Sequence, residues 1–216
     1  MKNLSLNKII VTQLQNIVLI SLISIVLISC NNEIALIEEE KETITDVEKM
    51  IRQLSSENFA TFEDAVLFFE ENVGYALTNK STRSESVSIS EKAAIALDRM
   101  ENVEVTIEMT LEDYRQELLA ILYSSNLDAD DEAALYVGIE ATIAVIEYKR
   151  NFPNESLTTR WFGDALRCLA GTVGSAGIGS FAGAGVGTVV LPVVGTVSGV
   201  AMGAFYGALV GAATFC

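Results

Sequence analysis

The residues of this sequence with the most reactive side chains are its three cysteines, Cys30, Cys168 and Cys216. A thiol can accept a lipid, pair in a disulfide or bind a metal. Three are too few for a four-cysteine zinc site. The chain also has no histidine, which excludes Ser-His and Cys-His catalytic dyads and His-ligated metals. The cysteines therefore indicate lipidation or disulfide formation, and we expect no cofactor.

Four acidic residues are grouped closely enough to suggest a calcium site: Asp128, Asp130, Asp131 and Glu132. The group lacks the glycine and the distal glutamate of an EF-hand loop. We interpret it as the solvated start of a helix and expect no metal. No phosphate-binding glycine loop and no acid pair with catalytic spacing stands out, so we expect a protein that is not an enzyme.

Charge divides the 216 residues, of formal net charge −15, into three parts. Residues 1–29 carry only Lys2 and Lys8, and residues 168–216 carry no charged side chain over 49 positions. Residues 30–167 therefore hold all 29 acids and the other 12 bases, a net charge of −17. An acidic chain repels phosphate backbones, so we expect no nucleic-acid partner.

The start of the chain has the features of an export signal. Lys2 and Lys8 precede a 12-residue apolar run, Ile17–Ile28, which is short for a membrane span. The run ends in Leu27-Ile28-Ser29-Cys30. This segment resembles bacterial lipoprotein signals, and the resemblance implies cleavage before Cys30 and lipid on that residue. The alternatives are an uncleaved anchor and an ordinary signal peptide.

The residues after Cys30 suggest where the protein resides. Asn31 stands where the inner-membrane retention signal of enteric lipoproteins has aspartate, and acids follow at Glu33 and Glu38–Glu40. This acidic stretch resembles that of surface-exposed lipoproteins of Bacteroidota. We therefore expect a lipid-anchored protein of the cell envelope, in the outer membrane, facing the periplasm or the outside.

Apolar residues recur at helical spacing through residues 43–152, which predicts a bundle of four or five amphipathic helices. The stripes begin at Val47, Phe62, Ala93, Leu111 and Ala134. Helix-capping patterns occur at Thr43-x-x-Asp46, Thr61-x-x-Asp64, Ser88-x-x-Glu91 and Thr110-x-x-Asp113. Residues 103–111 alternate like a strand without a partner, and we interpret them as helix or extended linker.

Residues 168–216 hold 12 of the 15 glycines, nine of them in one four-residue frame. Small residues at this spacing let helix backbones approach closely. The frame is interrupted only at Ser175 and Leu191. Its members are Gly171, Gly179, Gly183, Gly187, Gly195, Gly199, Gly203, Gly207 and Gly211.

Pro192 lies at the centre of this segment and predicts a turn between two helical arms, Cys168–Val190 and Gly195–Cys216. Arms of 23 and 22 residues would each be about 34 Å long as helices, enough to cross a bilayer. A turn at Pro192 brings Cys168 and Cys216 to one end, where they form a disulfide or stay as two free thiols. Before the first arm, interface anchors are expected at Arg160, Trp161 and Arg167.

This end resembles the glycine-zipper two-helix domain of outer-membrane lipoproteins of the rickettsial 17-kDa antigen type. It is also similar in pattern to the Gly-rich helices of class II bacteriocins. The double-glycine leader of bacteriocins is missing, and the acidic helical region departs from the short antigen type. The resemblance covers residues 168–216 and implies a membrane-inserting or self-associating hairpin.

The predicted protein is all-α: an acidic helical bundle followed by a Gly-rich hydrophobic helical hairpin. Its predicted segments are a signal peptide (1–29), an acidic tether (30–42), a helical domain (43–152), a basic and aromatic juxtamembrane linker (153–167) and the hairpin (168–216).

Three functions follow from this organisation. The leading one is a non-enzymatic envelope lipoprotein whose hairpin inserts into or oligomerises in a membrane, with membrane lipid and a homo-oligomer as partners. The alternative is an antibacterial, pore-forming protein with the hairpin as effector. In the third, the hairpin is the buried core of a periplasmic binding protein or enzyme.

Overall fold

The computed structural model describes residues 43–79, 89–106, 108–152, 161–192 and 194–216, within one compact unit of Glu42–Cys216. The described part is mostly helical with one small sheet, so the expected all-α class holds at that level. Its elements are helix 43–56, α2 (Phe62–Asn79), α3 (Glu91–Glu101), α4 (Leu111–Ser124), α5 (Ala129–Lys149), α6 (Trp161–Ala184), β1 (Thr188–Leu191), β2 (Gly195–Ser198) and α7 (Gly199–Phe215). Cys30 and its flanking segments lie outside the described residues.

Helix 43–56 and α2 to α5 form what we call the helical shell. Most residues of the apolar stripes predicted for these helices face inward, and Met50, Phe62, Leu97, Leu118 and Val137 are buried, whereas Ala94 is exposed. Sequence and packing therefore agree on which face of each helix meets the core.

Two of the predicted capping boxes are confirmed. Thr61 and Thr110 each accept a hydrogen bond from the backbone N–H of the acid three residues on, and that acid accepts one in return. The prediction at Ser88 is wrong, because α3 begins after Ser90, whose hydroxyl accepts from the Ala93 N–H. In the alternating run 103–111, residues 103–106 and 108–110 are not helical, and Leu111 starts α4.

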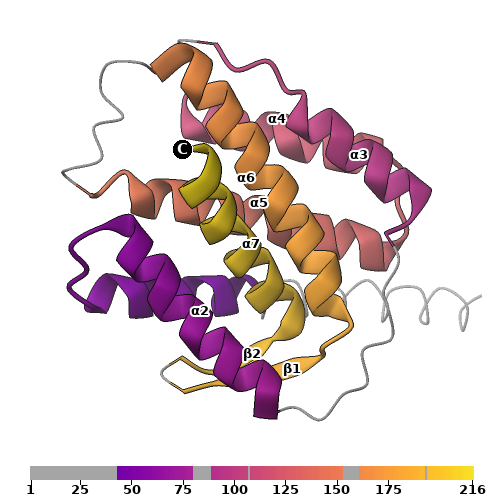
Figure 1. Ribbon diagram of the computed structural model, residues 1–216. Coiled ribbons are helices and arrows are strands. Elements are labelled where there is room, and N and C mark those ends of the chain that lie inside the picture. The colour runs from indigo at the N-terminus through magenta and orange to yellow at the C-terminus, as the bar shows by residue number, and fades with distance from the viewer. Residues whose placement is uncertain (1–42, 80–88, 107, 153–160, 193) are drawn as a thin grey trace, which may run out of the picture. The chain divides into compact units, whose positions relative to one another are not determined.

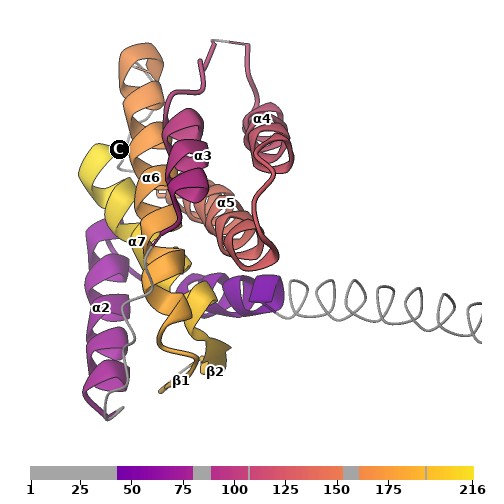
Figure 2. The ribbon, with the colours of Figure 1, turned by 90° about the vertical axis from the view of Figure 1, so that its right-hand side faces the viewer.

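The hairpin packs against the helical shell on one side. Figures 1 and 2 show α6 and α7 side by side, with α2 beside α7 and α3 beside α6. Helix α5 packs against both α6 and α7. The predicted helical domain and the predicted hairpin thus share one core.

The two arms of the hairpin differ from the expected continuous helices. Helix α6 starts at Trp161, before the predicted arm, and stops at Ala184, whereas α7 is only 17 residues long. Between them β1 and β2 pair antiparallel, with Val189 opposite Val197. The β-branched residues around Pro192 favour this strand pairing over helix. No helix of the described segments combines the length and hydropathy needed to cross a membrane.

Candidate functional site

The site that the sequence singles out is the hairpin of residues 168–216, and its glycines bring α6 and α7 into backbone contact. A Cβ atom on Gly179 or Gly183 would lie closer than 3.0 Å to the carbonyl groups of Gly203 and Gly199. The same holds in reverse for Cβ atoms on Gly203 and Gly199. Only glycine allows this approach, in which Cα–H groups face opposing carbonyl oxygens.

Toward the open end of the hairpin the same frame continues with other partners. A Cβ on Gly207 would meet the Ser175 carbonyl, and one on Gly211 would lie 2.8 Å from the Thr172 Cα. Gly171 makes room for the ring of Phe215 rather than for backbone. These contacts lie within one chain.

The two remaining glycines of the frame serve the turn. Gly187 and Gly195 have φ angles of +69° and +89°, a left-handed conformation that side chains disfavour, and an added Cβ there would touch nothing. Their predicted role in helix packing is therefore wrong. Pro192 is exposed between β1 and β2, so the chain does reverse there, as a β-hairpin.

The open end of the hairpin is joined by a disulfide between Cys168 and Cys216, across a sequence separation of 48. Beside it, the buried Thr172 hydroxyl donates a hydrogen bond to the Cys168 carbonyl and lies 3.7 Å from the Cys216 Sγ. A turn at one end and a cystine at the other make the hairpin a covalently closed loop.

A second set of glycines, outside the frame, packs α6 against the helical shell. A Cβ on Gly138 of α5 would lie 3.2 Å from the Gly177 Cα, and Gly177 itself faces Leu97 of α3. Gly174 lies under the Glu101 side chain. These three residues were not predicted as packing positions from the sequence. Gly138, a lone glycine inside an apolar helix, was the available signal, because such a glycine usually marks close packing.

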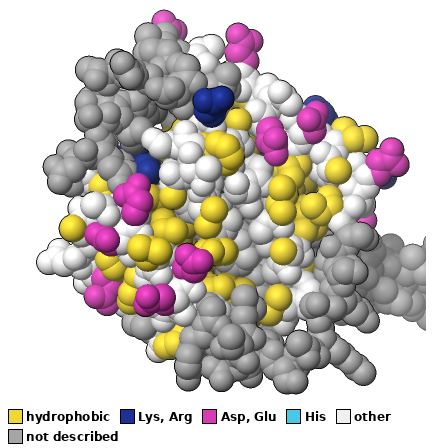
Figure 3. Space-filling view, viewed as in Figure 1, with side chains coloured by type: hydrophobic (Ala, Val, Ile, Leu, Met, Phe, Trp, Pro, Cys, Tyr) yellow, Lys and Arg dark blue, Asp and Glu magenta, His cyan; other side chains and the backbone are white. Residues whose placement is uncertain are grey.

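The exposed face of the hairpin is also apolar or uncharged. Ile178 of α6, Val190 of β1 and Phe215 of α7 are 54%, 66% and 41% exposed. Figure 3 shows hydrophobic side chains and uncharged backbone across this face, with most of the acidic side chains toward its sides. The hairpin thus has no charge either at its buried or at its solvent-facing positions.

Of the three predicted interface anchors, the structure describes the side chain of Arg167 alone. Arg160 and the Trp161 side chain lie outside what the structure describes, and Arg167 is exposed on α6. Another basic residue, Lys149 at the end of α5, is 4% exposed and points into the protein, where its ammonium group hydrogen-bonds a carbonyl of α7.

The acidic group at 128–132 has structural roles. The Asp128 carboxylate accepts from the Asp131 N–H at the start of α5, and Asp131 accepts from the Ser90 hydroxyl. In the described ranges no group of three metal-ligating side chains converges.

The perturbed titratable groups do not form a catalytic pair. Burial raises the pKa of the Tyr114 phenol far above its usual range, and the charge of Glu101 adds to this. Burial, with a smaller contribution from Asp98, also raises the pKa of Glu101. Burial raises the pKa of Tyr148 to about 12. Each shift disfavours the charged form, so these phenols stay protonated and are poor nucleophiles.

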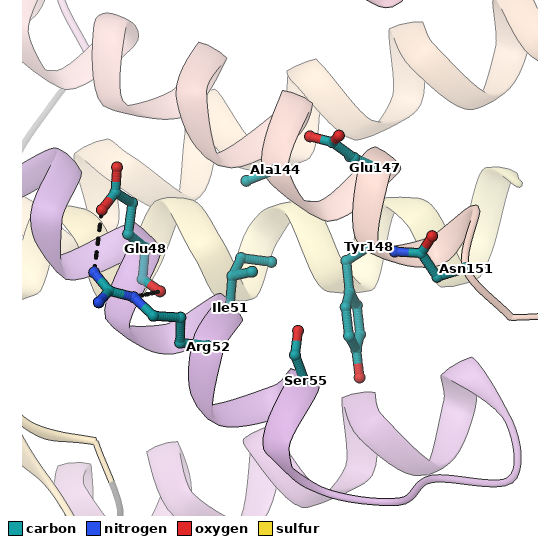
Figure 4. A pocket seen from close by; sticks show the side chains of 8 residues that line it. All are labelled: Glu48, Ile51, Arg52, Ser55, Ala144, Glu147, Tyr148 and Asn151. Carbon is teal, nitrogen blue, oxygen red and sulfur yellow. Dashed lines mark hydrogen bonds and ion pairs between the residues drawn. The ribbon is translucent and has the colours of Figure 1, made fainter.

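An open groove of about 390 Å³ lies between helix 43–56 and α5. Ile51, Ala144 and Tyr148 line it, and the exposed ion pair of Glu48 and Arg52 lies at one side (Figure 4). The Tyr148 hydroxyl donates to the Leu54 carbonyl, and Ser55 has no histidine or other base paired with it among the lining residues. The lining carboxylates are Glu48 and Glu147, and neither is hydrogen-bonded to the Ser55 hydroxyl in the described structure.

Comparison of the chain with protein families, curated proteins and solved structures finds no match. The function of the protein must therefore be inferred from its residues and their geometry.

Replacing Gly183 by alanine tests the close approach of α6 and α7. In an ordinary helix this change stabilises by about 1 kcal/mol. Here the new methyl would overlap the Gly199 carbonyl. We expect Gly183→Ala to lower the free energy of unfolding in urea by about 2 kcal/mol.

The exposed neighbour Ala182 provides a matched control. Ala182→Leu adds more atoms on the open side and should change stability by less than about 0.5 kcal/mol. A gain of stability in Gly183→Ala would contradict the described contact.

Removing the cystine tests the closed loop. We expect the Cys168→Ser, Cys216→Ser double variant to lose about 4 kcal/mol of unfolding free energy, because its unfolded chain is less restricted. Urea unfolding with and without dithiothreitol measures this. Dithiothreitol should destabilise the unmodified chain and Cys30→Ser but leave the double variant unchanged. If the unmodified chain gave the same unfolding curve with and without dithiothreitol, the bond between Cys168 and Cys216 would be absent.

Proposed function

We propose that this protein is a non-enzymatic lipoprotein of the cell envelope that carries a membrane-inserting hairpin in shielded form. Lipid on Cys30 anchors it, with the outer membrane as the proposed site. The helical shell covers the hairpin, and the hairpin inserts into a bilayer when it leaves the shell.

One observation carries this proposal: the hairpin has no charged side chain even where it faces solvent. A segment adapted only to a protein core places polar or charged residues at its exposed positions. Helix α5 does so with Glu147, whereas α6 and α7 present Ile178, Val210 and Phe215. A hairpin that is uncharged all round is compatible with both a protein cover and hydrocarbon.

The internal bonds of the hairpin support the same proposal. The contacts of the glycine frame, the strand pairing and the cystine all lie within residues 168–216, so none of them is lost when the shell is removed. In lipid, close backbone packing of small residues is a main source of helix association. We infer that the shell (43–152) and the hairpin (168–216) are separable units joined by residues 153–167.

The proposed partners are membrane lipid and a second copy of the chain. The backbone contacts of the glycine frame are already made between α6 and α7. A homo-oligomer would therefore use the exposed face around Ile178 and Val210, or exchange hairpins between copies. The net charge of −15 argues against nucleic acid as a partner.

A second candidate is an antibacterial effector in which the hairpin enters the membrane of another cell. The observation favouring it is that the covalent loop is self-contained, so cleavage before Cys168 would release it intact. Purified segment 160–216 should then release calcein from liposomes. Absence of leakage over a wide range of doses would count against this role and leave the anchored protein.

Lipidation is tested by metabolic labelling with palmitate in an expressing bacterium. We expect label on the unmodified chain and none on Cys30→Ser, because Cys30 alone has the lipoprotein context. The Cys168→Ser, Cys216→Ser variant is the matched control and should keep its label. Label on Cys30→Ser would contradict the assignment.

Insertion is tested with a secreted Cys30→Ser chain, which has no lipid. We expect the folded chain to stay largely in the supernatant of vesicles washed with alkaline carbonate. After brief opening in urea and dilution into vesicles of phosphatidylethanolamine and phosphatidylglycerol, it should remain in the pellet. A chain truncated before residue 161 is the control and should wash off. Complete removal of the opened chain by carbonate would overturn the proposed function.

A further inference from the structure

Helix α7 has no charged side chain, yet a buried charge from the helical shell contacts each of its ends. Among the described residues the buried charged side chains are Asp46, Asp131 and Lys149. Two of these three contact the ends of α7, and the third, Asp131, contacts Ser90 at the start of α3.

At the N-terminal end the contact comes from helix 43–56. The Ser198 backbone N–H donates a 2.8 Å hydrogen bond to Asp46 Oδ2, and Ser198 is the N-cap of α7. Asp46 is 4% exposed, and its other oxygen accepts from the Lys49 ammonium at 2.7 Å. Both carboxylate oxygens therefore have donors.

At the C-terminal end the contact comes from α5. Lys149 Nζ donates a 3.2 Å hydrogen bond to the Ala212 carbonyl in the last turn of α7. The same ammonium lies 4.3 Å from the centre of the Phe62 ring on α2. Lys149 thus joins α5, α2 and α7 at one buried point.

The signs of the two charges match the helix dipole of α7. A carboxylate lies at the positive N-terminal end and an ammonium at the negative C-terminal end. The apolar contacts of α7 with the shell can be replaced by lipid contacts without much loss. Charge-assisted hydrogen bonds cannot, because hydrocarbon offers no donor or acceptor.

We propose that Asp46 and Lys149 are a two-point latch that holds the hairpin in the helical shell, and that losing either charge releases the hairpin toward a lipid bilayer. The inference rests on the proposed function for its second half. Helix α6 follows α7, because the glycine contacts and the cystine join the two helices.

Amide hydrogen exchange on the folded, secreted Cys30→Ser chain tests the latch without lipid. We expect Asp46→Ala and Lys149→Met to speed exchange of the amides within 199–215 about tenfold, as expected for losing one charge-assisted hydrogen bond. Asp46→Asn removes the charge but keeps the shape and one oxygen acceptor, so it should speed this exchange less than Asp46→Ala does. Asp131→Asn is the matched control, since it removes a buried charge that does not contact α7. It should leave 199–215 unchanged.

The vesicle assay then tests release. Asp46→Ala and Lys149→Met should increase the carbonate-resistant fraction without urea, whereas Asp131→Asn should not. The latch is overturned if amide exchange within 199–215 is the same in all variants. It is also overturned if Asp46→Ala and Lys149→Met speed that exchange no more than Asp131→Asn does.

Two outcomes separate the latch from the proposed function. If the urea-opened chain enters vesicles but the latch variants do so no more than Asp131→Asn, the latch proposal alone is overturned. If the urea-opened chain does not enter vesicles, the proposed function is overturned, and so is the release of the hairpin into lipid. Faster amide exchange confined to 199–215 in the latch variants would then support only the first half of the inference, that Asp46 and Lys149 hold α7 in the shell.

Discussion

Helices α6 and α7 approach each other so closely that a methyl group at Gly179, Gly183, Gly199 or Gly203 would overlap the opposing backbone. This contact uses main chain where most helix pairs use interlocking side chains. It determines the rest of the hairpin. Two left-handed glycines allow the tight β-hairpin at one end, and Cys168 comes within bonding distance of Cys216 at the other.

A helix pair joined through backbone buries few side chains between its members, so its larger side chains point away from the pair. The helical shell covers them on one side. Phe205 of α7 packs against Phe69 of α2 with ring centres 5.0 Å apart, and Gly177 of α6 admits Leu97 of α3. The bulky inner stripes of the shell and the small residues of the hairpin are therefore complementary parts of one core.

Local pattern was enough to predict the helices of the shell and two of its caps, because spacing and capping are properties of neighbouring residues. It also placed the reversal of the chain at Pro192. The strand pairing around this turn was not predicted, since a glycine frame of constant spacing continues through residues that fold as β-strands. Contacts between segments that are far apart in the sequence could not be predicted either. Nothing near Asp46 or Lys149 in the sequence indicates that each contacts an end of α7. The close crossing of Gly138 and Gly177 likewise depends on which helices become neighbours.

The cystine between Cys168 and Cys216 has a topological consequence. A linear segment can leave a packed core gradually, end first, with one turn of helix at a time exposed to water. A closed loop cannot, because pulling on one arm draws the other along with it. If the hairpin leaves the shell as proposed, it has to do so sideways and in one step, which avoids intermediate states with half of its apolar surface in water. The same bond that stabilises the folded protein therefore makes any departure of the hairpin cooperative.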